Sequence, residues 1–135
     1  MPTEPRALQD FLGHWLLSKT IRQADGQTAA FDGTASWTAS AEGALYTERG
    51  TLNLAGAAPL TAERQYRWTD ALDVFFDDGR FFHRVPPLGG PAAHWCDPDQ
   101  YEVTYDFGTW PVFSAHWVVK GPRKDYSMAC FYKPA

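Results

Sequence analysis

Cysteine, histidine and long apolar runs are all scarce in this sequence of 135 residues. The two cysteines, Cys96 and Cys130, lie in a chain whose first ten residues lack the charged and then apolar pattern of a secretion signal. We therefore expect free thiols rather than a disulfide. No apolar run approaches the roughly 20 residues that a membrane-spanning helix needs. These absences predict a cytoplasmic protein that does not enter a membrane.

The charge balance excludes a further class of partner. The net charge is −4, and the chain contains no basic tract that would neutralise a row of phosphates. The glycine pair Gly89 and Gly90 stands in a proline-broken connector, unlike a phosphate-binding loop. A Gly-x-Ser-x-Gly nucleophile motif is absent as well. We therefore expect no nucleic-acid partner.

Aromatic residues, in contrast, are abundant: the chain has six Trp, six Tyr and nine Phe. Such rings suit β-strands and fill wide interiors, and they also line ligand pockets. A chain of this length forms one domain, here residues 1–135, and buries about two thirds of the surface that its unfolded form exposes. We expect a core that needs neither a disulfide nor a metal.

The sequence alternates with a period of two after a short helical segment at 5–12, and turn residues interrupt it about every eight to twelve residues. This pattern predicts an all-β fold with that one N-terminal helix. The expected strands are 14–23, 31–40, 44–53, 62–69, 72–77, 80–85, 92–96, 100–107, 112–120 and 125–133.

Short connections favour antiparallel neighbours, and the clearest one is the Asp78-Gly79 turn between two aromatic runs. A sheet of so many strands removes its exposed edges by curling and closing. We therefore predict a closed antiparallel up-and-down barrel of about eight to ten strands. A two-sheet sandwich is the alternative, but it usually needs longer cross-over connections than this chain offers.

Two sets of motifs resemble known families. Asp10-Phe-Leu-Gly-His-Trp is similar to the opening of lipocalins and cytoplasmic fatty-acid-binding proteins, in which a Trp on the first strand, here Trp15, plugs one barrel end. Lipocalins meet that Trp with an Arg near the end of the last strand, where this chain has Lys133, so Lys133 or a distant Arg has to substitute. The last strand also lacks the Arg-x-Tyr carboxylate clamp of fatty-acid-binding proteins.

Longer stretches resemble an uncharacterised bacterial and fungal domain family of calycin type. This resemblance implies a calycin-like barrel and no established activity. The stretches are Glu63-Arg-Gln-Tyr-Arg-Trp, Phe76-Asp-Asp-Gly-Arg-Phe-Phe-His, His94-Trp-Cys-Asp-Pro-Asp-Gln-Tyr, Tyr105-Asp-Phe-Gly-Thr-Trp-Pro and Gly121-Pro-Arg-Lys-Asp-Tyr.

Strand alternation predicts which side chains point into the barrel. The face with the larger rings is taken as the inner one, and in the hairpin the face that carries His83 is chosen over that of Phe75, Phe82 and Arg84. The predicted inner residues are Arg64, Tyr66, Trp68, Val74, Phe76, Phe81, His83, Tyr101, Val103, Tyr105, Phe107, Tyr126, Met128, Cys130 and Tyr132.

An inward arginine requires a partner or water. Arg64 therefore either pairs with an internal carboxylate, stacks on Trp15, or anchors an acidic group of a ligand. The alternation of turns also predicts one charged rim opposite Trp15, where mutual ion pairing between turns competes with a ligand-gating role. That rim consists of Asp77, Asp78, Arg80, Asp97, Asp99, Arg123, Lys124 and Asp125.

His94 and Cys96 share a strand face, but structural zinc needs four N or S ligands and a Cys–His nucleophile needs an oxyanion site. The glycine-rich opening of heme-binding calycins is replaced here by Leu16-Leu-Ser-Lys. We therefore expect no metal and no cofactor, and we expect His83 and His94 to be hydrogen-bonded interior or rim residues.

Three functions are compatible with this barrel. The first is the binding of a small apolar or planar molecule, with an acidic group as one variant. The second is an enzyme that uses Tyr, His and Arg for acid–base chemistry in the same cavity. The third is a filled barrel that acts through its outside as an interaction module or homodimer, with an exposed aromatic patch around Trp37, Trp95 or Trp110. The expected ligand-binding residues are Arg64, Tyr66, His83, His94, Tyr101, Tyr105, Arg123 and Tyr126.

Overall fold

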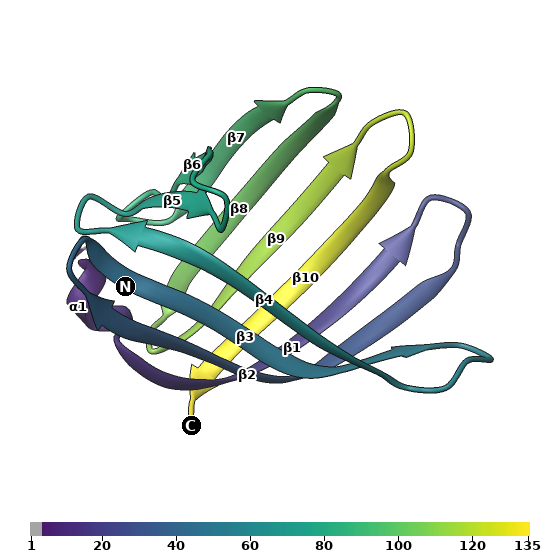
Figure 1. The fold of residues 1–135 in the computed structure, drawn as a ribbon, viewed down its shortest axis with the longest axis horizontal. Helices are drawn as coiled ribbons and strands as arrows, with labels where there is room; N and C mark the ends of the chain where they lie inside the picture. The colour runs from purple at the N-terminus through teal and green to yellow at the C-terminus, as the bar shows by residue number, and fades with distance from the viewer. Residues whose placement is uncertain (1–3) are drawn as a thin grey trace.

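Ten antiparallel strands form a single curled sheet in the computed structural model, which describes residues 4–135 (Figure 1). The all-β barrel prediction is confirmed. The elements are α1 (Leu8–Phe11), β1 (Gly13–Gln23), β2 (Thr28–Ser40), β3 (Gly43–Leu54), β4 (Leu60–Thr69), β5 (Asp73–Phe76), β6 (Phe81–Arg84), β7 (Gly90–Cys96), β8 (Asp99–Thr109), β9 (Val112–Lys120) and β10 (Asp125–Pro134).

The strand order follows an up-and-down meander, in which strands consecutive in the chain pair with one another, except β6 and β7, and β1 pairs with β10. The sheet order begins at β6 and ends at β7, and these two strands are not hydrogen-bonded neighbours. Side chains span this seam instead: the rings of Phe81 and His94 lie 5.7 Å apart, and the Arg80 guanidinium donates to Cys96 Sγ over 3.7 Å. The barrel is therefore nearly closed.

The helix is shorter than the predicted segment 5–12. Ahead of α1, the Arg6 amide donates to the Pro87 carbonyl over 2.7 Å, so this part of the chain is held to the β6–β7 connection instead of continuing the helix. Asp10 accepts a 2.8 Å hydrogen bond from the Ala7 amide at the start of α1. No helix among residues 4–135 has the length and apolar character to cross a membrane.

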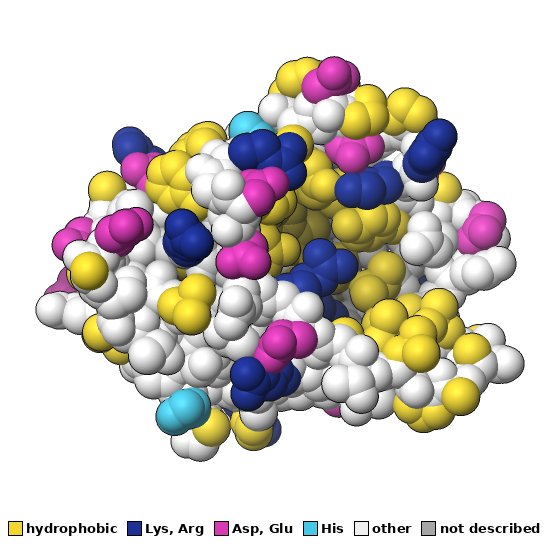
Figure 2. Space-filling model, viewed as in Figure 1, with side chains coloured by type: hydrophobic (Ala, Val, Ile, Leu, Met, Phe, Trp, Pro, Cys, Tyr) yellow, Lys and Arg dark blue, Asp and Glu magenta, His cyan; other side chains and the backbone are white. Residues whose placement is uncertain are grey.

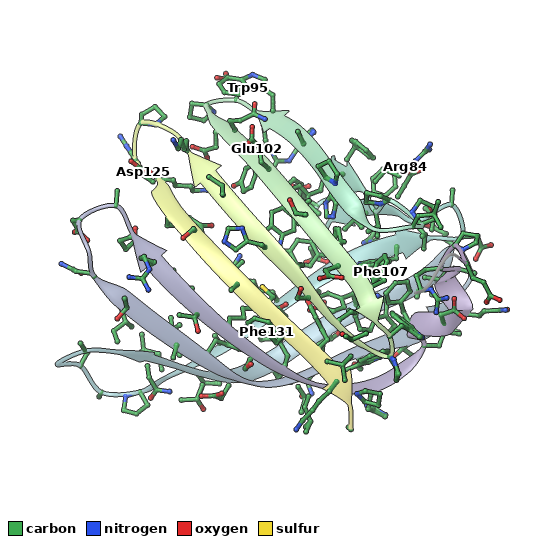
Figure 3. All side chains as sticks on the ribbon, turned by 180° about the vertical axis from the view of Figure 1, so that it is seen from behind. Arg84, Trp95, Glu102, Phe107, Asp125 and Phe131 are labelled. Atoms are coloured by element: carbon green, nitrogen blue, oxygen red, sulfur yellow. The ribbon has the colours of Figure 1, made fainter. Side chains whose placement is uncertain are left out.

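A cluster of rings fills the barrel end beneath α1. Phe11 is fully buried, and the centroids of five other rings lie within 6.0 Å of its own. These five rings belong to Trp37, Trp68, Phe107, Trp110 and Phe113. The cluster closes this end of the barrel, which is the end where Phe107 lies in Figure 3, and Trp95 lies at the opposite end.

Trp15 joins this cluster, as its resemblance to the lipocalin tryptophan implies. It is buried against Trp37, Trp110 and Phe113, and its indole N–H donates to the Phe11 carbonyl over 2.8 Å. The cation at this end is Arg6, whose guanidinium lies 4.6 Å from the centre of the Trp110 ring. A distant arginine thus packs on this ring cluster, whereas Lys133, the register partner of Leu16, is exposed.

A glycine pair brings β2 and β3 close together. Gly33 and Gly50 are direct register partners on the inner face. A Cβ atom on Gly50 would lie 2.6 Å from Cζ of the buried Phe31 ring, and a Cβ on Gly33 would lie 2.6 Å from the Gly50 Cα. Neither position has room for a side chain.

The substitution Gly50→Ala is expected to lower the free energy of unfolding by about 1–3 kcal/mol, because the added methyl must displace Phe31 or the β2 backbone. Chemical denaturation measures this loss. The neighbouring exposed residue provides the control, since Thr51→Ala is expected to change stability by less than about 0.5 kcal/mol. Equal stability of the Gly50→Ala and wild-type proteins would contradict the close packing of these two strands.

Candidate functional site

A cavity of about 440 Å³ occupies the half of the barrel away from α1. Its lining includes the last residues of β1 and the first residues of β10, so it opens at the rim formed by the β1–β2 and β9–β10 turns. Figure 2 shows the hollow, with hydrophobic side chains inside it and charged side chains around its mouth. The volume falls in the range of about 300–1,000 Å³ that is usual for small-molecule sites.

Three nearly parallel aromatic rings line this cavity. The Phe82 ring lies 4.4 Å from that of Phe76 and 5.2 Å from that of Trp117, with interplanar angles of 22° and 17°. Tyr66 stacks on the same Phe82 ring at 5.9 Å. Flat, ordered rings of this kind present a surface on which a planar apolar molecule can stack.

A buried ion pair stands among these apolar groups. Lys19 on β1 and Glu48 on β3 are hydrogen-bonded through Glu48 Oε1, and both side chains are almost fully buried. The Tyr46 hydroxyl donates to Glu48 Oε2 over 2.6 Å and lies 2.8 Å from the Tyr132 hydroxyl. Both carboxylate oxygens of Glu48 are therefore engaged by the protein itself.

Burial governs the acidity of the groups beside this pair. Burial, with a further contribution from the Glu48 carboxylate, raises the pKa of Tyr46 and that of Tyr132 well above the ordinary value of a phenol. Burial also raises the pKa of the Cys130 thiol to about 12. These side chains are neutral at pH 7, so Cys130 does not supply a thiolate nucleophile.

His83 forms a second polar group with Tyr105 on the cavity lining. Its Nε2 lies 2.9 Å from the Tyr105 hydroxyl, whereas its Nδ1 is buried without a partner. Burial, with a smaller effect of His94, lowers the pKa of His83 to about 3, and burial raises the pKa of Tyr105. His83 is therefore a neutral imidazole at pH 7.

Arg64 lies at the mouth, where it keeps an exposed side chain and lines both the cavity and a shallower groove beside the β5–β6 turn. Burial lowers the pKa of Arg64, but the neighbouring Tyr66 hydroxyl and, after it, the Glu48 carboxylate more than offset this effect. Among residues 4–135, no carboxylate oxygen lies within 4.0 Å of a guanidinium nitrogen of Arg64, so Arg64 forms no ion pair.

Six of the eight expected ligand-binding residues line the cavity: Arg64, Tyr66, His83, Tyr101, Tyr105 and Tyr126. His94 and Arg123 lie outside the lining. The His94 ring packs against Phe81 and Phe82 at the seam, and Arg123 is exposed in the β9–β10 turn. Their role in ligand binding remains a prediction.

The predicted inner face of the hairpin is wrong at two positions. Phe81 is 45% exposed, whereas Phe82 is buried and lines the cavity beside His83. The register explains this, because Val74 pairs with His83 but Phe75 pairs with Phe81, which leaves Phe82 as an extra residue. A bulge of this kind places two successive side chains on one side of a strand.

The charged rim contains one ion pair within a turn and one that joins a turn to a neighbouring strand. Arg80 binds Asp78 over 2.8 Å inside the β5–β6 turn. Lys124 joins the β9–β10 turn to β8, through Asp99 over 3.2 Å and the Tyr101 hydroxyl over 2.9 Å. Of the three tryptophans considered for an exposed patch, Trp95 is 58% exposed and Trp37 is buried.

Sequence reasoning missed the residues at the polar centre of the cavity, namely Lys19, Glu48 and Tyr46. A usable signal was present for the first two: Lys19 shares a strand face with Trp15 and Leu17, and Glu48 shares one with Tyr46. A charged residue among inward-facing apolar ones indicates a buried partner. Among the described residues, no three His, Cys, Asp or Glu side chains converge as metal ligands would.

Acidification is expected to destabilise the fold through His83. Its pKa is lower in the folded protein, about 3, than in the unfolded chain, where it is about 6.5, so below pH 6.5 the unfolded chain binds the proton first. Stability is thus unaffected by His83 above pH 6.5 and decreases towards pH 3. Between pH 6.5 and 4.5 the loss amounts to about 2 kcal/mol.

Denaturation at both pH values, in wild type and in His83→Gln, measures this contribution. The variant is expected to lose less stability on acidification than the wild type. His116→Gln, which alters an exposed histidine, is expected to keep the wild-type dependence. The same dependence in all three proteins would show that His83 is not held neutral by the fold.

Comparison with known proteins places the chain in a family. No curated protein matches it in sequence. Its fold resembles the structure of the S-type phycobiliprotein lyase CPES from Guillardia theta, with a TM-score of 0.58 at 9% sequence identity, over 93% of this chain and 87% of that one. Residues 11–134 match a family described as being of unknown function (DUF6314). The chain belongs to the DUF6314 family.

Proposed function

We propose that this protein binds a small, largely apolar, planar molecule inside the barrel. The observation that carries this proposal is the cavity of about 440 Å³, whose lining combines stacked rings with a few fixed polar groups. Small-molecule sites have this composition, in which apolar surface supplies affinity and the polar groups supply orientation. The resemblance in fold supports a barrel, but it does not indicate which ligand this protein binds.

The filled barrel is the weaker alternative. Protein interiors are close-packed, and a small barrel that acts only through its outer surface has no reason to keep a hollow. Here the ring cluster around Phe11 fills the end beneath α1, whereas the rings of the other half surround the cavity. An empty apolar volume of this size would reduce stability without serving any purpose.

Acid–base catalysis is also less favoured, although His83 and Tyr105 are hydrogen-bonded on the cavity lining. Proton transfer is most effective when the pKa of the catalytic group lies near the working pH. Burial moves both pKa values away from neutrality, that of His83 down to about 3 and that of Tyr105 upwards. The pair therefore acts as a fixed polar feature of the cavity.

Fluorescence titration with the neutral aromatic probe N-phenyl-1-naphthylamine tests the proposal. We expect saturable binding of one probe per barrel, because its fused rings match the stacked lining. Ile21 is half-buried on the inner face near the mouth, so Ile21→Trp fills part of the cavity and is expected to weaken binding by about tenfold or more.

The adjacent residue gives a matched control. Thr20 is exposed on the outer face of the same strand, and Thr20→Trp is expected to leave probe affinity within about twofold of wild type. Denaturation of both variants verifies that they are folded. Failure of the wild type to bind the probe, or equal affinity of the two variants, would contradict a binding site in this cavity.

A further inference from the structure

Arg64 lies at the mouth of the cavity and forms no ion pair with the described residues. This is unexpected, because an acidic residue stands directly beside it on the neighbouring strand. Arg64 and Glu48 are direct register partners on β4 and β3. Opposite charges in such a cross-strand position normally pair. Here Glu48 gives one carboxylate oxygen to Lys19 and the other to Tyr46, so its charge is already engaged.

The other acidic residues near Arg64 do not form an ion pair with it either. Glu63 binds Arg49, and Asp78 binds Arg80. Asp77 lines only the neighbouring groove, and its carboxylate is more than 4.0 Å from the guanidinium. Arg64 thus faces the cavity without a carboxylate of its own chain, among the residues that the structure describes.

A comparison of all charged residues of the cavity lining also leaves Arg64 without an ionic partner. Three cations line the cavity, and two of them are compensated: Lys19 by Glu48, and Lys124 by Asp99. The remaining lining acid, Glu63, is compensated by Arg49. One positive charge, that of Arg64, is left at the mouth of an apolar hollow, where an anion would stabilise it.

We propose that the molecule bound in this cavity is an aromatic acid, whose oxyanion group Arg64 holds at the mouth while its ring system stacks deeper in the barrel. This inference rests on the proposed function. A guanidinium offers paired N–H donors that match the two oxygens of a carboxylate, sulfonate or phosphate. Tyr66 and Phe76 line the cavity and the groove together with Arg64, so aromatic surface begins directly beside the cation.

A pair of probes with the same ring skeleton isolates the charge. 8-Anilinonaphthalene-1-sulfonate carries an oxyanion, and N-phenyl-1-naphthylamine lacks it. Arg64→Gln is expected to weaken binding of the sulfonate by about 10- to 100-fold, which corresponds to the loss of a charged hydrogen bond, and to leave the amine within about twofold. Mutual displacement of the two probes verifies that they share one site.

Arg67 supplies the matched control, because it lies on the outer face of the same strand and Arg67→Gln changes the net charge equally. It is expected to leave both affinities unchanged, and Arg64→Lys is expected to retain part of the sulfonate binding. Unchanged sulfonate affinity in Arg64→Gln, or an equal loss for both probes, would overturn the inference. If the amine itself does not bind wild type, the proposed function fails instead.

Competition then identifies the acidic group. 1-Naphthoate, 1-naphthyl phosphate and the neutral 1-naphthalenemethanol share one ring system, and the displacement of the bound amine is to be measured for each. We expect either acid to compete better than the alcohol, and the better of the two indicates the natural group. Equal competition by the alcohol would contradict recognition of an oxyanion.

Discussion

The interior of this barrel depends on one buried ion pair, between Lys19 and Glu48. Removing two charges from water costs several kcal/mol for each ion, and only close contact with complete hydrogen bonding offsets that cost. The Tyr46 hydroxyl completes the carboxylate and is itself linked to Tyr132. This polar layer runs along one wall of the barrel, from β3 to β1 and β10, and places charged and hydroxyl groups on the cavity lining.

The two halves of the barrel interior meet at this layer. Below it, the rings around Phe11 and Trp15 pack against one another and supply the apolar burial that stabilises the fold. Above it, the lining stays wide enough for a cavity that opens at the rim. The same layer engages both carboxylate oxygens of Glu48, and among the described residues Arg64 is left without an ion pair at the mouth.

Much of this arrangement could be predicted from strand alternation, because Tyr66, Tyr105 and Tyr126 face inward in regular strands. Alternation failed at Phe82, where the bulge in β6 shifts the face by one residue. It also gave no means of pairing Lys19 with Glu48, since these residues lie 29 positions apart and a whole strand separates them. Local pattern fixes the face of a side chain, whereas a contact between β1 and β3 also depends on the registers in which both strands pair with β2.

A double-mutant cycle on Lys19 and Glu48 tests the central role of the ion pair most directly, with the free energy of unfolding as the measured quantity. Lys19→Met and Glu48→Leu, made singly, are each expected to lose about 3–5 kcal/mol, because each leaves one buried charge unpaired. The double variant is expected to recover most of that loss, since no charge remains buried. Single losses below about 1 kcal/mol, as in an exposed pair, or a double variant as unstable as the sum of the singles, would contradict this account.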